Sequence, residues 1–535
     1  MNFRLVSEKT LFLLVAGIHL IPLLNNRVFF TIDGPAHIYN AKLIYHLLFS
    51  EGIFNTAFWI NPESVPNWTG HLFLVILNFI FKPLVSEKLL QIILVAGIPL
   101  AFRFAVSRIH FHGSLWSYFI FPFSYSFVFI NGFYNFCFSL LFFFLAIGVI
   151  SSFFNKSFSF KKSFLLFLLF LLTYFSHPFT FLFLVMAAGL FYMISYPVDS
   201  PLSDLVFIKK KRKTYLFKGL ILILVSAIPI YLLYSFLSVR EHTEESFRYS
   251  YTELVKWIWQ LRPLILFSWD EVKYTQPLFF ILIFGFLGVL FERCRIGFRT
   301  GCKVVKKLMA ARLLTPATVF LILMIVSLCL YFTLPDTDRN ASFISVRLCM
   351  MFFLFFIIWL SQTQIKRWIM VSMIYIVLSI SFIRLNHINR IAANLNRDVA
   401  SLIYLDRFIL PEKVIIPLDI SGNWLYGHLI NYIAIHKPVL LLENYEASKK
   451  YFPVLWKEKL LPDYTLGKLS QSNLPCLYWK TNPDGLKLPA DYVLVNGHIA
   501  RSTDDCIAKA YQEILSSYEW VTNSEPFTLY RLKEQ

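Results

Sequence analysis

The sequence contains a series of long apolar runs that follow one another with short polar connections. The runs cover residues 11–30, 89–106, 115–130, 133–154, 164–175, 179–196, 216–237, 278–290, 317–334, 346–360 and 368–383. A spanning helix needs about 20 mostly apolar residues, so flanking residues must extend the shorter runs. Charged residues make up only 15% of the chain, whereas soluble domains average about 25%. The sequence therefore predicts a polytopic α-helical membrane protein with about eleven spanning helices.

The formal net charge of +18 lies mostly in short loops between the apolar runs, which argues against a nucleic-acid partner. A weaker run, 71–85, is expected to lie along the membrane surface or to enter it only partway. With a cytoplasmic N-terminus, every strongly basic loop then falls on the cytoplasmic side. These loops are 103–108, 156–162, 209–213, 293–312 and 366–367. We therefore expect a multi-pass protein of the cell (inner) membrane, surrounded by membrane lipids, with an extracytoplasmic C-terminus.

This topology gathers polar stretches at the outer face of the membrane. They are a first loop at 31–71 and connections at 131–135, 176–178 and 335–340, the last of which leads to Arg347. The first loop opens with Asp33-Gly34-Pro35, and Pro is favoured in the first helical turn. A helix N-terminus at Asp33 lowers the pKa of its carboxyl and keeps it ionised, as a general base requires. The alternative is that Asp33 only caps a surface helix.

From about residue 385 the composition becomes that of a soluble domain. Predicted strands at 413–417, 439–442, 492–495 and 527–532 alternate with predicted helices at 394–410, 424–436 and 504–518. This alternation is typical of a small α/β domain. We therefore divide the chain into a transmembrane domain, 1–385, and an extracytoplasmic α/β domain, 386–535. An exported location permits a disulfide between Cys476 and Cys506, and no Cys/His spacing predicts a zinc site.

Several motifs resemble the GT-C superfamily of membrane glycosyltransferases, which includes protein O-mannosyltransferases and aminoarabinose transferases. The segment 33–41, Asp-Gly-Pro-Ala-His-Ile-Tyr-Asn-Ala, is similar to the first-loop motif of bacterial members. Glu63 precedes Pro66, as an acidic residue precedes a Pro in those enzymes. The segment 132–136, His177-Pro178 and the outer segment leading to Arg347 also resemble bacterial relatives. The chain lacks the Asp-Glu pair of the first motif, and residues 386–535 do not resemble the C-terminal domains of better-known members.

The resemblance, over residues 10–385, implies a sugar donor on a polyprenyl phosphate and a glycan, lipid or protein acceptor. It implies that Asp33 is the general base of an inverting transfer, with Glu63 as the second catalytic acid. Arg347 is expected to stabilise the leaving phosphate, because Arg suits phosphate geometry. The other expected substrate-binding residues are His37, Asn67, His71, Tyr134, Asn135, His177, Asp336 and Asp338. No cofactor is required by this reading, and a divalent cation is left open.

Each candidate also has a plainer interpretation. His177-Pro178 caps a helical hairpin, Asp336 and Asp338 are solvated loop charges, and Glu63 is an ordinary loop acid. Arg347 extends to lipid head groups or pairs with one of the aspartates, and Tyr134 and Asn135 belong to an interfacial turn. Competing classes are a lipid or polysaccharide transporter or flippase and a non-catalytic membrane scaffold. A polysaccharide polymerase or ligase is closer in chemistry. Against a transporter, the sequence has no inverted repeat and no chain of ionisable residues through its apolar runs.

Overall fold

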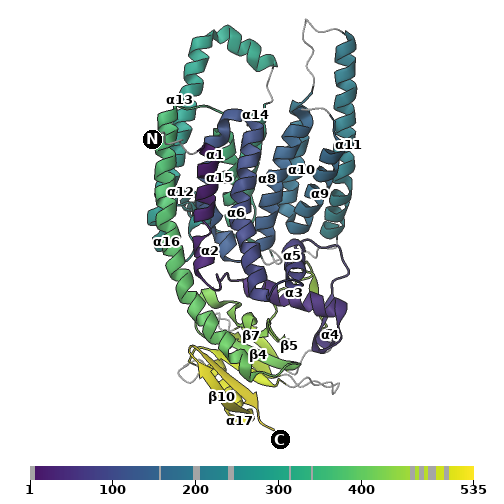
Figure 1. Ribbon diagram of the computed structural model, residues 1–535, viewed down its shortest axis with the longest axis vertical. Coiled ribbons are helices and arrows are strands. Elements are labelled where there is room, and N and C mark those ends of the chain that lie inside the picture. Colours follow the sequence, from purple (N-terminus) through teal and green to yellow (C-terminus); the bar gives the residue numbers. More distant parts are fainter. Residues whose placement is uncertain are drawn as a thin grey trace, which may run out of the picture. The chain divides into compact units, whose positions relative to one another are not determined.

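A computed structural model describes residues 7–155, 158–196, 205–238, 246–311, 315–338, 342–457, 464–468, 475–479, 490–498 and 505–534. The chain is mostly helical, with strands concentrated towards its C-terminal end (Figure 1). It forms two compact units. The helical unit comprises residues 1–21 and 92–387, and the loop unit comprises residues 22–91 and 388–535.

The helical unit is built from helices that follow the apolar runs. Its elements are α1 (Glu8–Ile18), η1 (Phe111–Ser124), α7 (Phe127–Ile130), α8 (Tyr134–Asn155), α9 (Phe160–Ser176), α10 (Pro178–Ile194), α11 (Leu205–Ser238), β2 (Ser246–Phe247), α12 (Tyr251–Trp259), η2 (Arg262–Leu264), η3 (Trp269–Glu271), α13 (Val272–Ala311), α14 (Pro316–Thr333), β3 (Thr337–Asp338) and α15 (Ile344–Leu360). Strands β2 and β3 pair antiparallel. Helices α6 (Pro83–Ile109) and α16 (Arg367–Leu405) contribute residues to both units.

Among the described residues, seven helices are long and apolar enough to cross a membrane. They are Glu8–Asn25, Pro83–Ile109, Tyr134–Phe154, Arg212–Ser238, Trp269–Arg295, Pro316–Thr333 and Arg367–Phe408. Three further apolar helices, Thr69–Asn78, Pro178–Ile194 and Ile344–Leu360, are shorter. The chain therefore has the character of a membrane protein, but the predicted count of about eleven spans is not confirmed.

Two departures from the expected helices have local causes. The apolar run 115–130 is not one α-helix, because most of it lies in the 3₁₀ helix η1, which contains Pro122. The span at 368–383 and the amphipathic helix at 394–410 were expected as separate elements. In the structure α16 runs through both, since no Gly or Pro interrupts residues 367–405.

The loop unit combines short helices with several small sheets. Its elements are α2 (Ile21–Asn25), α3 (Gly34–Phe49), α4 (Ile53–Ala57), β1 (Phe58–Ile60), α5 (Thr69–Asn78), η4 (Asp406–Phe408), β4 (Lys413–Asp419), η5 (Trp424–Tyr426), η6 (Leu429–Ala434), β5 (Val439–Leu441), β6 (Val454–Trp456), β7 (Tyr464–Lys468), β8 (Pro475–Trp479), β9 (Tyr492–Asn496), α17 (Asp505–Ser517), β10 (Tyr518–Ser524) and β11 (Phe527–Leu532). The predicted strands at 413–417, 439–442, 492–495 and 527–532 and the helix at 504–518 are confirmed.

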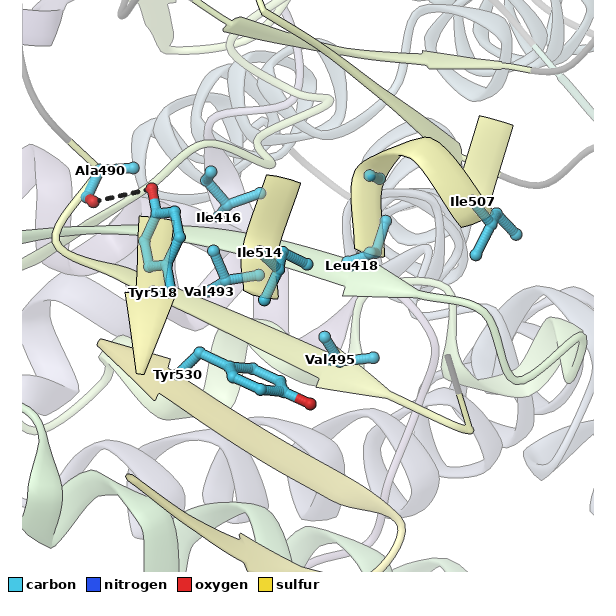
Figure 2. Packing of buried hydrophobic residues seen from close by; sticks show 10 residues of the cluster. Ile416, Leu418, Ala490, Val493, Val495, Ile507, Ile514, Tyr518 and Tyr530 are labelled. Atoms are coloured by element: carbon cyan, nitrogen blue, oxygen red, sulfur yellow. Dashed lines mark hydrogen bonds between the residues drawn. The ribbon is translucent and has the colours of Figure 1, made fainter. Parts of the chain in front are cut away.

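The main sheet of the loop unit has five strands in the order β10-β11-β9-β4-β5. Strand β4 is parallel to β5 and β9, whereas β11 is antiparallel to β9 and β10. Helix α17 packs on this sheet through Ile507 and Ile514, which belong to one buried cluster with Ile416 and Val493 of the strands, and Ile514 lies beside Val493 (Figure 2). The expected helix at 424–436 is instead two short 3₁₀ helices, η5 and η6, interrupted at Gly427.

Contacts from the first loop hold the C-terminal half of the loop unit in place. Strand β1 pairs antiparallel with β6, and the Phe58 ring stacks on Trp456 with centroids 4.1 Å apart. The buried Tyr39 hydroxyl donates to the carbonyl of Val439 and accepts from the Leu441 amide at 2.9 Å. The chain leaves the helical unit at 387/388, close to the expected boundary, but residues 22–91 also join the loop unit. The side chains of Cys476 and Cys506 lie outside the described residues.

Candidate functional site

Asp33 stands immediately before α3 in the loop unit. Its carbonyl accepts the first hydrogen bond of the helix, from the His37 amide at 2.9 Å. Among the described residues, no side-chain capping hydrogen bond joins Asp33 to α3. The carboxyl is instead almost buried, with the residue 9% exposed. Helix capping alone therefore does not explain why an acid is kept at this position.

The neighbours of Asp33 come from the C-terminal half of the chain. Nε2 of His428 lies 3.7 Å from Asp33 Oδ1, and His428 Nδ1 lies 2.6 Å from Glu443 Oε1. The His428 ring stacks on Tyr445 with centroids 4.4 Å apart, and the Tyr445 hydroxyl donates to Glu446 Oε1 at 3.4 Å. His428 thus lies between two carboxylates, those of Asp33 and Glu443.

The pKa values of this group follow from burial and mutual charge. Burial lowers the pKa of His428, but Glu443 and Asp33 outweigh it and raise the pKa to about 9. His428 is therefore a cation at neutral pH. Burial raises the pKa of Asp33, although His428, His37 and Tyr445 act in the opposite direction. The expected lowering of this pKa by the helix N-terminus is wrong, because desolvation of the carboxyl is the larger effect.

A second group of three side chains lies next to the first. Nδ1 of His37, on α3, is 2.8 Å from Glu446 Oε1, and Nε2 of His71, on α5, is 2.7 Å from Glu446 Oε2. The two ring nitrogens are 3.2 Å apart, and the three side chains are at most 4% exposed. Burial raises the pKa of Glu446, but the facing imidazoles hold it well below its usual range. These are residue types that bind divalent metal ions.

Further hydrogen bonds orient this second group. Nδ1 of His71 lies 3.0 Å from the carbonyl of Asn67, a residue with a backbone φ of +67°, which Asn tolerates better than most residues. The Asn40 amide donates to Glu446 at 2.8 Å, and Asn40 and Asn444 exchange hydrogen bonds. Three of the expected site residues, His37, Asn67 and His71, are thus brought together with Glu446.

The helical unit contains a separate polar group. Nη1 of Arg347, in the first turn of α15, lies 3.4 Å from Nε2 of His177, and its guanidinium lies over the Phe133 ring at 4.4 Å. Burial and then the charge of Arg347 lower the pKa of His177 well below its usual value. Since guanidinium can only donate, Nε2 of the neutral ring accepts and Nδ1 carries the hydrogen. This Nδ1 is buried with no hydrogen-bond partner among the described residues.

The remaining expected residues have varied surroundings. Asp336 is buried, and its Oδ1 accepts from the Ser345 amide at 3.0 Å, so it caps α15 rather than being a solvated charge. Tyr134 and Asn135 are buried at the start of α8. Asp338 lies in β3, and its side chain is outside the described residues. Glu63 is exposed in the first loop, and its role stays a prediction.

Four residues of the loop-unit site were not expected from the sequence: His428, Glu443, Tyr445 and Glu446. Glu446 lies 375 residues from His71 along the chain, so no local spacing reveals the pair. One signal was present, since an acidic segment follows the apolar strand 439–442, and ligand-binding groups often follow the carboxyl ends of parallel strands.

No protein-family model matches the chain, and a search of curated proteins finds no match. The residues of the site itself, above all Asp33 and His428, therefore indicate its chemistry.

Proposed function

We propose that this protein is a membrane glycosyltransferase that moves a sugar from a polyprenyl-phosphate carrier to an acceptor hydroxyl on the extracytoplasmic face. The observation that carries the proposal is Asp33, a buried carboxyl that makes no capping bond within the described part of the chain, beside His428, whose pKa is raised to about 9. The apolar helices suit a lipid-linked donor, and the resemblance of segment 33–41 to first-loop motifs of membrane glycosyltransferases is consistent with it.

In this reaction Asp33 acts as the general base. The acceptor hydroxyl gives its proton to the Asp33 carboxylate, and its oxygen forms a bond to the anomeric carbon. The bond between that carbon and the phosphate oxygen breaks on the opposite side, and its electron pair leaves with the polyprenyl phosphate. The sugar configuration is therefore inverted.

The surroundings of Asp33 fit a base of this kind. Burial raises its pKa and so strengthens it as a proton acceptor, while the His428 cation favours its ionised form before the reaction. Glu443 holds the other ring nitrogen of His428 at 2.6 Å, which orients the ring and stabilises its charge. Positioned acid–base groups typically contribute about 10²–10⁴ in rate.

Arg347 and His177 are proposed to contact the donor phosphate. Guanidinium forms strong charge-assisted hydrogen bonds to phosphate, and the buried Nδ1–H of His177 is a further donor without a partner among the described residues. This assignment concerns the helical unit alone and is tested by its own variants.

The test uses the full chain reconstituted in vesicles, with polyprenyl-phosphate sugars as donors and hydroxyl acceptors in excess. We expect release of polyprenyl phosphate and a product of inverted anomeric configuration, measured by NMR. Asp33→Asn should lose at least about 100-fold in rate. Asp398→Asn is the matched control, because Asp398 is a part-buried acid of the same loop unit whose side chain, among the described residues, accepts from the Tyr426 hydroxyl.

The other classes predict different results. A flippase or transporter moves the lipid-linked sugar across the vesicle membrane without breaking the bond to phosphate. A scaffold does neither, and it is insensitive to Asp33→Asn. Either pattern, with a folded wild-type protein, contradicts the proposal.

A further inference from the structure

In the group formed by His37, His71 and Glu446, a ring nitrogen lone pair faces a carboxylate oxygen, so two acceptors meet without a hydrogen between them. The Asn67 carbonyl accepts from His71 Nδ1 at 3.0 Å, so this nitrogen carries a hydrogen. In a neutral ring Nε2 then has only a lone pair. That lone pair faces a carboxylate oxygen at 2.7 Å and the His37 ring nitrogen at 3.2 Å. The arrangement therefore needs at least one added positive charge at its centre.

We infer that His37, His71 and Glu446 bind one Zn²⁺ ion. Imidazole nitrogen and carboxylate oxygen are ligands that zinc prefers, and the three ligand atoms lie within 4.8 Å of one another. Two ligands at about 2.05 Å on a tetrahedral ion are ~3.3 Å apart, close to the 3.2 Å between the two ring nitrogens. One divalent ion would take the His71 Nε2 lone pair and the Glu446 carboxylate as ligands, together with His37 Nδ1 in the tautomer that carries its hydrogen on Nε2.

The contacts around these residues are those that orient metal ligands. The hydrogen bond from His71 Nδ1 to Asn67 fixes the tautomer that presents Nε2, the usual outer-shell arrangement of a zinc-bound histidine. The Asn40 amide holds Glu446 Oε2 at 2.8 Å. Both partners are backbone or amide groups, which stay in place whether or not the ligands are protonated.

The ion would join three separate segments of the loop unit. His37 comes from α3, His71 from α5, and Glu446 from the segment after β5. Asp33 lies one turn before His37, and Tyr445 is the residue next to Glu446. Zinc binding would therefore stabilise the loop unit and fix the positions of His37 and Tyr445 near Asp33.

The test measures metal content and does not depend on activity. The full-length protein in detergent is stripped with a chelator, incubated with Zn²⁺ alone, desalted and analysed by mass spectrometry. We expect about one zinc per chain in the wild type and a loss of at least about tenfold in His71→Ala and His37→Ala. His46→Ala is the matched control, because His46 is also on α3 but binds Ser50 at 2.7 Å, and it should keep its zinc.

A second measurement covers the case in which the variants do not fold. X-ray absorption of the zinc-loaded wild type should show nitrogen and oxygen ligands at about 2.0–2.1 Å with imidazole scattering. Less than about 0.2 zinc per wild-type chain, a sulfur ligand at about 2.3 Å, or zinc content unchanged in a folded His71→Ala protein would overturn the inference. A protein that binds zinc can lack glycosyl transfer, and a protein that transfers sugar can lack zinc. The metal content and the transfer rate therefore test the two proposals separately.

Discussion

Two histidines, the partly buried His428 in the loop unit and the buried His177 in the helical unit, have opposite electrostatic surroundings. His428 lies between Glu443 and Asp33, and its pKa is raised to about 9. His177 lies against the Arg347 guanidinium, and its pKa is far below the usual value. Burial acts in the same direction on both rings, so the sign of the neighbouring charge decides the protonation state.

This contrast assigns different chemistry to the two regions. The loop unit gathers carboxylates and imidazoles, which transfer protons and bind cations. The helical unit presents a guanidinium over the Phe133 ring and, next to it, a neutral imidazole N–H, which together suit an anion. Variants in each unit test this contrast separately.

Arg347→Gln removes the cation of the helical unit. We expect the KM for the polyprenyl-phosphate donor to rise by about 10–100-fold, because a hydrogen bond to a charged group contributes about 1.5–3 kcal/mol. Steady-state kinetics over a range of donor concentrations measures this. Arg248→Gln is the control, since Arg248 is bound to the exposed Tyr251 of the same unit. An unchanged KM for the donor in Arg347→Gln would contradict the proposal that Arg347 binds the donor phosphate.

Glu443→Gln removes a counter-charge from His428 and so lowers the pKa of that ring. We expect turnover at pH 7.5 to fall by about tenfold, since the charge beside Asp33 is partly lost. The activity of the variant should recover towards lower pH, where His428 is protonated again. Glu519→Gln, which alters a surface pair with Arg531, is the control. A pH profile identical to that of the wild type contradicts the proposed role of Glu443.

The raised pKa of His428 also predicts a pH dependence of stability. The folded pKa is about 9 and the unfolded value about 6.5, so the contribution is complete below pH 6.5 and is lost as pH rises through 9. Asp33, Glu443, Tyr445 and Glu446 are the titratable groups that act on the ring.

We expect the wild type to lose about 3 kcal/mol more unfolding free energy than His428→Gln between pH 6 and pH 9.5. Thermal or denaturant unfolding of both proteins in the same detergent measures the difference. Parallel pH dependence of the two proteins would show that His428 is not held as a cation.

Glu63→Gln should have the smallest effect. The Glu63 side chain is exposed, in contrast to the buried Asp33 and Glu446, so we expect turnover to change by less than about threefold. Consumption of the polyprenyl-phosphate sugar donor measures the turnover of this variant. A loss comparable to that of Asp33→Asn would instead restore the role of second catalytic acid that the resemblance implied for Glu63.

Much of the loop-unit sheet could be predicted because its central strands are short apolar runs. Strand β10 was missed, since its sequence Tyr-Glu-Trp-Val-Thr-Asn-Ser is mostly polar and it lies at the edge of the sheet. The span count was harder, because apolarity alone does not separate an α-helix from the 3₁₀ helix around Pro122.

The candidate site was predictable only on its N-terminal side. Asp33, His37 and His71 stand out because polar residues are rare near the first apolar runs. Their partners His428 and Glu446 lie in an ordinary soluble composition, where acids and histidines attract no notice. The pairing depends on β1 joining β6 and on Tyr39 holding β5, contacts between residues about 400 positions apart.

The most direct test of the account is the rate of glycosyl transfer by Asp33→Asn relative to Asp398→Asn, at equal amounts of folded protein in the same vesicles. If Asp33 is the general base, the wild type and Asp398→Asn transfer sugar from a polyprenyl-phosphate donor at similar rates, and Asp33→Asn is at least about 100-fold slower. Equal rates in all three proteins would contradict the assignment of Asp33 as the general base.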